Sequence, residues 1–136
     1  MKKILMIGLV SLLILTGCTS KSDMVLNSKK TAEMYDAKET FVLYVTSSTC
    51  PACQIYDEVY DDVSSNYKNV MYKIDYQAEV GKNEEEFTNL VVNHLGYVDA
   101  TPTTIFIVDG EEVGRSVGIM KYSDLENSIK NYKISK

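Results

Sequence analysis

The sequence Thr49-Cys50-Pro51-Ala52-Cys53 decides the fold, because it joins an apolar run to a stretch with helical periodicity. The apolar run, 41–45, shows no polar alternation and is rich in residues that favour β-structure, which predicts a central strand covered on both faces. Beyond Cys53 the spacing predicts an amphipathic helix with a buried stripe at Ile55 or Tyr56, Val59, Val63 and Tyr67. The strand therefore delivers Cys50 to the first turn of a helix, in which Pro51 and Ala52 are the first residues.

This placement favours redox chemistry at the two cysteines. At a helix start a sulfur meets unpaired backbone N–H groups and the positive end of the helix dipole, and both favour the thiolate. Cys53 lies one turn further along on the same face, so the pair can form a disulfide. Structural disulfides mostly close longer loops, because their stabilising effect grows with loop length. We therefore predict a catalytic pair in which Cys50 attacks and Cys53 resolves.

The first 17 residues are predicted to be a lipoprotein signal peptide. A basic start at 1–3 precedes an apolar run, 4–15, that is too short to span a bilayer comfortably. The run ends in Leu15-Thr16-Gly17-Cys18, which resembles the bacterial lipobox and implies that Cys18 is lipidated as the first mature residue. An uncleaved anchor and an ordinary signal peptide cut near Thr19 are the alternatives, and each still directs the domain outward.

The expected mature protein is a single acidic domain on the bacterial cell membrane. A diacylated Cys18, carrying palmitate or a similar chain, supplies enough acyl chain for stable extracytoplasmic attachment. Residues 18–27 are predicted to be a flexible tether and 28–136 one domain, which suits a chain of 136 residues. Cleavage removes Lys2 and Lys3 and takes the formal charge from −5 to −7, which argues against nucleic acid as a partner.

The remaining pattern predicts alternating strands and helices. A second strand at 70–75 is expected to run parallel to the first, because a helix lies between them. Asp109-Gly110 predicts a hairpin between strands at 103–108 and 112–117. Three further helices are expected at 28–39, 84–96 and 123–132, with N-caps at Asn27 or Ser28, at Asn83, and at the Ser123-Asp124-Leu125-Glu126 capping box.

This order of elements resembles the thioredoxin fold over residues 28–134. The resemblance has three anchors: the Cys-Pro-Ala-Cys sequence after a buried strand, the segment Ala100-Thr101-Pro102-Thr103, and Gly118 after the last strand. It implies an α/β domain in which helices flank a central mixed sheet, with an extended helical segment before a cis-proline loop. It also implies a cis Pro102 beside the active-site sulfurs and a Thr101 backbone that binds an extended client peptide.

The sequence departs from typical thioredoxins at several positions near this site. Thr49 occupies the position of a tryptophan, and Tyr44 occupies that of a buried acid that assists proton transfer at the resolving cysteine. The role of general base therefore has no obvious owner. Lys73 lies near the position of a strand lysine often found in the family, and we interpret it as an ordinary surface lysine outside the site. The Pro-Ala dipeptide does not give the direction of electron flow.

The resemblance implies a monomeric thiol–disulfide oxidoreductase that acts on exported proteins and is recharged by a membrane or extracytoplasmic redox partner. The stretch 38–44 before the Cys-Pro-x-Cys sequence is similar to that of small bacterial extracytoplasmic thioredoxin-like proteins, including bacteriocin-transport accessory proteins. The alternative is a non-enzymatic binding module, such as a metal chaperone or a transport accessory protein. No cofactor is expected beyond the Cys50–Cys53 disulfide, and no metal, because a closed zinc site needs about four ligands and His94 is the only histidine.

Overall fold

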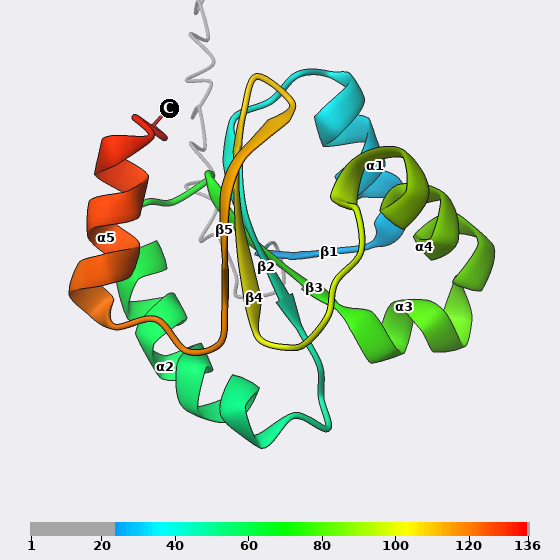
Figure 1. Ribbon diagram of the computed structural model, residues 1–136, viewed down its shortest axis with the longest axis horizontal. Coiled ribbons are helices and arrows are strands. Elements are labelled where there is room, and N and C mark those ends of the chain that lie inside the picture. Colours follow the sequence, from blue (N-terminus) through cyan, green and yellow to red (C-terminus); the bar gives the residue numbers. More distant parts are fainter. Residues whose placement is uncertain (1–23, 136) are drawn as a thin grey trace, which may run out of the picture.

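The computed structural model describes residues 24–135, which form a five-stranded mixed sheet with helices on both faces (Figure 1). The spatial order of the strands is β1-β3-β2-β4-β5. The strands are β1 (Val25–Leu26), β2 (Phe41–Thr46), β3 (Met71–Asp75), β4 (Thr103–Val108) and β5 (Glu111–Val117). The first three are mutually parallel, whereas β4 is antiparallel to both β2 and β5. The expected α/β architecture with a central mixed sheet is confirmed.

The helices divide between the two faces of the sheet. On one face lie α2 (Pro51–Ser64) and α5 (Tyr122–Asn131), and on the other α1 (Ser28–Asp36), α3 (Tyr76–Lys82) and α4 (Glu84–Leu90), which continues as a π-helical turn, η2 (Val91–Leu95). Each face has its own apolar core, and β2 contributes to both. Val42 and Tyr44 pack under α2 and α5, whereas Phe41, Leu43 and Val45 pack under α1 and α4. The unbroken apolar run thus forms a strand that is buried on both faces, as predicted.

The buried face of α2 differs in part from the predicted stripe. Ile55 is 63% exposed, and the residues of α2 that face the sheet are Cys53, Tyr56, Tyr60 and Val63. These buried residues still recur at spacings of three and four, as predicted for an amphipathic helix. The buried stripe begins at Cys53, because the helix starts at Pro51 and its first turn lies against the sheet. Tyr60, which is not part of the predicted stripe, is completely buried, and its hydroxyl donates to the carbonyl oxygen of Tyr72 at 2.8 Å.

The described fold includes residues before 28, which the sequence analysis assigned to the tether. Val25 and Leu26 form β1 at the sheet edge, paired with Lys73 and Ile74 of β3. Asn27 then caps α1 by accepting the N–H of Lys30 at 2.8 Å, which confirms one of the two predicted caps. The predicted signal peptide and Cys18 lie outside the described residues. Within residues 24–135, no helix is long and apolar enough to cross a membrane.

Several predicted helix boundaries are wrong. The first helix ends at Asp36 instead of residue 39, because Lys38 adopts a positive φ of 55°. The last helix begins at Tyr122 with Lys121 as its N-cap, so Ser123 lies inside the helix and the predicted capping box does not form. The start of α4 is as predicted, with Asn83 at the N-cap before Glu84, although the Asn83 side chain makes no capping hydrogen bond.

The helix α3 was not predicted. Two side chains fix its position, Asp75 at its N-terminus and Glu79 one turn later. Asp75 caps it by accepting the N–H of Ala78 at 3.0 Å. One turn later the carboxylate of Glu79 reaches across to the start of α1, where it accepts the backbone N–H of Ser28 at 2.7 Å and its hydroxyl at 2.5 Å. Glu79 and Ser28 are both buried. This carboxylate fixes α3, and hence the chain that follows β3, against α1.

Replacing Glu79 by alanine should lower the free energy of unfolding by about 1–3 kcal/mol, because the N–H and hydroxyl of buried Ser28 lose their acceptor. Urea unfolding followed by circular dichroism measures the change. Glu58→Ala, at an exposed position of α2, is the matched control and should change stability by less than about 0.5 kcal/mol. Equal stability of the two variants would show that the Glu79 carboxylate does not hold α3 to α1.

Candidate active site

Cys50 and Cys53 form a disulfide across the first turn of α2, with their Cα atoms 5.2 Å apart. Cys50 is the N-cap of the helix in an extended conformation, with φ −100° and ψ 109°. Pro51 follows at the first helical position, where a missing N–H has no cost because that group has no intrahelical partner. Ala52 completes the start of the helix. The predicted strand–turn–helix context of the two cysteines is therefore present.

The two sulfurs differ in exposure and in electrostatic surroundings. Cys50 is partly exposed, whereas Cys53 is only 1% exposed. The backbone N–H of Cys53 points at the Cys50 sulfur, with the nitrogen 3.1 Å away. In the reduced protein this N–H and the positive end of the α2 dipole both stabilise a thiolate on Cys50. Solvent and large partners therefore reach the sulfur that is better stabilised as an anion.

The cis-proline segment lies against this disulfide. The Thr101–Pro102 peptide bond is cis, as the family resemblance implied. The carbonyl oxygen of Thr101 is 3.3 Å from the Cys50 sulfur. Pro102 is buried, and its carbonyl accepts the N–H of Gly118 at 2.8 Å. The fold thus brings together the three separate sequence anchors: the cysteine pair, Thr101-Pro102 and Gly118.

Comparison with known proteins identifies the family. A family model for a thioredoxin-like domain matches residues 28–133. The chain belongs to the thioredoxin-like family. It is 31% identical over 108 residues to thioredoxin H4 of Arabidopsis thaliana, covering 76% of this chain and 82% of that protein. Thioredoxin H5 of the same plant is 28% identical over 105 residues, covering 76% and 80%. Together with the Cys50–Cys53 pair, membership of this family supports thiol–disulfide oxidoreductase activity as the general class of function.

Solved structures agree on the fold. Thioredoxin f from spinach chloroplast superposes with a TM-score of 0.63 at 21% identity, covering 81% of this chain and 92% of that one. Reduced thioredoxin from Schistosoma mansoni superposes with a TM-score of 0.59 at 26% identity, covering 79% and 95%. The similarity therefore extends over nearly the whole of each smaller thioredoxin.

Two buried tyrosines lie beneath the disulfide. The hydroxyl of Tyr44 donates to the carbonyl oxygen of Cys53 at 3.2 Å, and that of Tyr56 lies 2.9 Å from the hydroxyl oxygen of Thr104. Burial raises the pKa of Tyr44 far above its ordinary value and raises the pKa of Tyr56 to about 12. Both hydroxyls therefore keep their protons at neutral pH. Tyr44 holds the backbone of Cys53 in place but cannot act there as a base.

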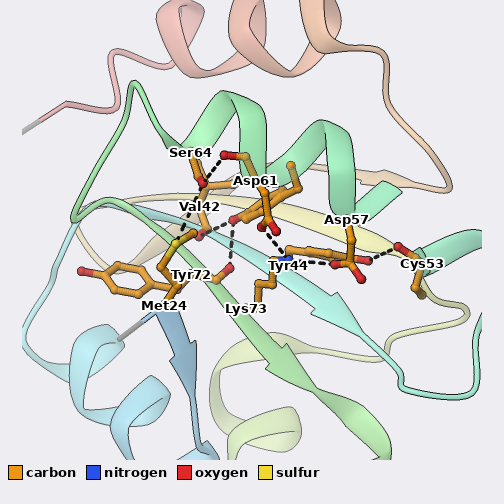
Figure 2. A network of polar contacts seen from close by, with 10 residues as sticks. Met24, Val42, Tyr44, Cys53, Asp57, Asp61, Ser64, Tyr72 and Lys73 are labelled. Atoms are coloured by element: carbon orange, nitrogen blue, oxygen red, sulfur yellow. Dashed lines mark hydrogen bonds and ion pairs between the residues drawn. The ribbon is translucent and has the colours of Figure 1, made fainter. Parts of the chain in front are cut away.

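The interpretation of Lys73 as an ordinary surface lysine is wrong. Its side chain is only 12% exposed, and its Nζ lies 2.8 Å from Oδ1 of Asp57 and 2.7 Å from Oδ1 of Asp61 (Figure 2). The same Nζ lies over the rings of Tyr44 and Tyr60, at 5.5 and 5.6 Å from their centroids. The parallel register pairs Lys73 with Tyr44 and so puts the lysine beneath α2. A sequence signal existed, because Asp57 and Asp61 are four residues apart on that helix.

His94 belongs to the opposite face of the sheet. It lies in η2, where its Nε2 is 3.4 Å from Oδ1 of Asp36 and its ring stacks on Tyr35. Among residues 24–135, no group of three or more histidine, cysteine or acidic side chains is arranged to hold a metal ion. The structure gives His94 a packing role between η2 and α1.

A shallow cleft runs beside the cysteine turn. It has a volume of about 430 Å³, and its walls come from the loop after β2, the start of α3 and the segment before Pro102. Thr49, Gln77, Tyr97 and Thr101 are among the residues that line it. Thr49 donates its hydroxyl to Gln77 at 2.7 Å, which fixes the loop before Cys50 to α3. The cleft is therefore lined by Thr49, which precedes Cys50, and by Thr101, whose carbonyl contacts the Cys50 sulfur.

Alkylation of reduced Cys50 should show a thiolate that forms more readily than in a free cysteine. Iodoacetamide rates measured across pH, with the Cys50 peptide read by mass spectrometry, should have a midpoint below about 8.5. The expected cause is the N–H of Cys53 together with the helix terminus. In denaturant the midpoint should return to about 8.5, because the helix is then lost. A folded-state midpoint at or above the denatured one would contradict this role for α2.

Proposed function

We propose that this protein is a membrane-tethered, extracytoplasmic thiol–disulfide oxidoreductase that exchanges disulfides with exported proteins. The observation that carries the proposal is the disulfide between one accessible and one buried sulfur, at a helix start and beside the Thr101 carbonyl. Labile disulfides of this kind are exposed and close short loops, whereas structural ones resist reduction. Membership of the thioredoxin-like family supports the same chemistry.

The exchange follows from the different environments of the two sulfurs. In the reduced protein the Cys50 thiolate attacks one sulfur of a client disulfide, and the other client sulfur leaves as a thiolate. This step gives a mixed disulfide between Cys50 and the client. The thiolate of Cys53 then attacks the Cys50 sulfur, forms the disulfide that the structure contains and releases the client thiolate. Two electrons pass to the client, and the same steps in reverse oxidise a client dithiol.

The location is proposed from the N-terminal sequence. The basic start, the short apolar run and the lipobox-like Leu15-Thr16-Gly17-Cys18 support export followed by lipidation of Cys18. A lipid-anchored domain outside the cytoplasm works where protein disulfides persist. A membrane or extracytoplasmic redox partner would return the Cys50–Cys53 pair to its starting state after each turnover.

Trapping experiments should separate the roles of the two cysteines. Cys53→Ser should accumulate disulfide-linked adducts with exported proteins, because the resolving thiol is missing, and dithiothreitol should release them. Cys50→Ser should form few or none, since the remaining sulfur is buried. Non-reducing gels of the cell envelope, probed for this protein, measure both variants.

Equal trapping by the two variants would contradict the assigned roles. Trapping by neither variant, together with no turnover of the wild-type protein in insulin reduction or refolding assays, would favour the non-enzymatic binding module instead.

Replacing Cys18 by alanine should abolish membrane attachment through lipid. In a bacterial host the wild-type protein should lose residues 1–17, incorporate labelled palmitate and sediment with membranes, whereas Cys18→Ala should incorporate no label. Cys50→Ala, a change inside the folded domain, is the matched control and should remain labelled. Mature wild-type protein that begins near residue 19 without label would contradict the lipoprotein proposal.

A further inference from the structure

The second step of the proposed exchange needs a proton acceptor near Cys53. This thiol is 1% exposed, and burial disfavours the thiolate form that must attack Cys50. Tyr44 does not serve, because its hydroxyl already donates to the Cys53 carbonyl and burial raises its pKa. His94 packs on the other face of the sheet. The acceptor has to come from the side of the sheet on which Cys53 lies.

Asp57 is the carboxylate nearest to Cys53 along α2. The two residues are four positions apart, and side chains at this spacing lie next to each other on one helix face. The side chain of Asp57 is 41% exposed, so its carboxylate can exchange a proton with solvent after it has accepted one. The groups that face Asp57 are Lys73 from β3, Tyr44 from β2 and Asp61 on its own helix.

Lys73 fixes the position of this carboxylate. The Lys73 Nζ lies over the rings of Tyr44 and Tyr60. It also pairs with the two aspartates of α2, as Figure 2 shows. Such a nearly buried ammonium group keeps a neighbouring carboxylate oriented at a defined place. Asp61 pairs with the same Nζ at 2.7 Å but lies one helical turn further from Cys53. The two aspartates therefore share a cation and differ in their distance from the thiol.

We propose that Asp57, positioned by Lys73, accepts the proton of the Cys53 thiol during resolution, an inference that rests on the proposed exchange reaction. The S–H bond of Cys53 breaks, and the proton passes to the Asp57 carboxylate directly or through solvent. The sulfur electron pair then forms the bond to Cys50 while the bond between Cys50 and the client breaks, and the client sulfur leaves as a thiolate. In the reverse direction Asp57 returns the proton to Cys53. Asp57 thus provides the carboxylate for proton transfer at Cys53, since the position that holds a buried acid in typical thioredoxins is Tyr44 in this chain.

The two steps can be timed separately with dithionitrobenzoate as the client. Mixing it with the reduced Cys18→Ala protein, in which Cys50 and Cys53 are the only two thiols, releases one thionitrobenzoate when Cys50 attacks and a second when Cys53 resolves. In Asp57→Asn the rate of the first phase should stay within about twofold of wild type. The rate of the second phase near pH 6.5 should fall at least about tenfold, because a general base typically accelerates proton transfer by more than this. In this variant the rate of the second phase should increase about tenfold for each unit of pH, as expected when hydroxide alone removes the proton.

Asp61→Asn is the matched control, since it removes a carboxylate from the same lysine one turn further from Cys53. Its second phase should stay within about twofold of wild type, and Asp57→Glu should restore most of the lost rate. Lys73→Met should slow the second phase but not the first, which is the result expected of a positioning residue.

An unchanged second phase in Asp57→Asn, or equal slowing in Asp61→Asn, would overturn the role of Asp57 and leave the exchange reaction standing. Absence of the first phase in the wild-type protein would overturn the proposed function, and the role of Asp57 with it.

Discussion

The burial of β2 on both faces of the sheet is the constraint on which the site depends. Every side chain from Phe41 to Val45 is withdrawn from solvent, and alternate residues pack into the cores on the two sides of the sheet. A strand held in this way has little freedom to shift, because a slip of one residue would exchange its two faces. The loop that follows β2 therefore leaves the sheet at a fixed point, and Cys50 begins α2 beside the cis peptide bond at Pro102.

The site combines two kinds of polar interaction. On the exposed side, both polar contacts of the reactive sulfur come from the backbone: the N–H of Cys53 and the carbonyl of Thr101. On the buried side, side chains form an extended network in which a single lysine joins two carboxylates and two aromatic rings. A buried tyrosine in place of a buried acid keeps uncompensated charge out of the interior. The carboxylates lie instead on the helix surface, where solvent and Lys73 stabilise them.

Local sequence was sufficient for features that depend on neighbouring residues. The apolar run before the motif predicted β2, and Asp109-Gly110 predicted the hairpin, in which both residues adopt a positive φ. The start of α2 at the motif followed from the change of periodicity. The cis bond at Pro102 followed from the family resemblance and not from the residues alone.

The features that were missed depend on long-range pairing or on weak local signals. The burial of Lys73 results from the register of β3 against β2, which no short stretch encodes. The phase of α2 depends on which side of its first turn meets the sheet, so Ile55 and Tyr56 could not be distinguished by spacing. The two residues of β1 and the seven of α3 are too few for periodicity to identify. The capping box predicted at Ser123 does not form, because the residue with the extended N-cap conformation is Lys121, two residues before the serine.

The parallel direction of β1 bears on how the domain would sit at a membrane. Cys50 follows the carboxyl end of β2, whereas a chain that enters β1 arrives from the amino end of the same parallel strands. Seven residue steps separate Cys18 from Val25, and an extended chain of that length spans at most about 25 Å. A lipid on Cys18 would hold the amino-terminal ends of the parallel strands toward the bilayer. The disulfide, at their carboxyl ends, would then face away from the membrane. Such a domain would stay close to the headgroups, and its reactive sulfur would be accessible to proteins that approach from the outside.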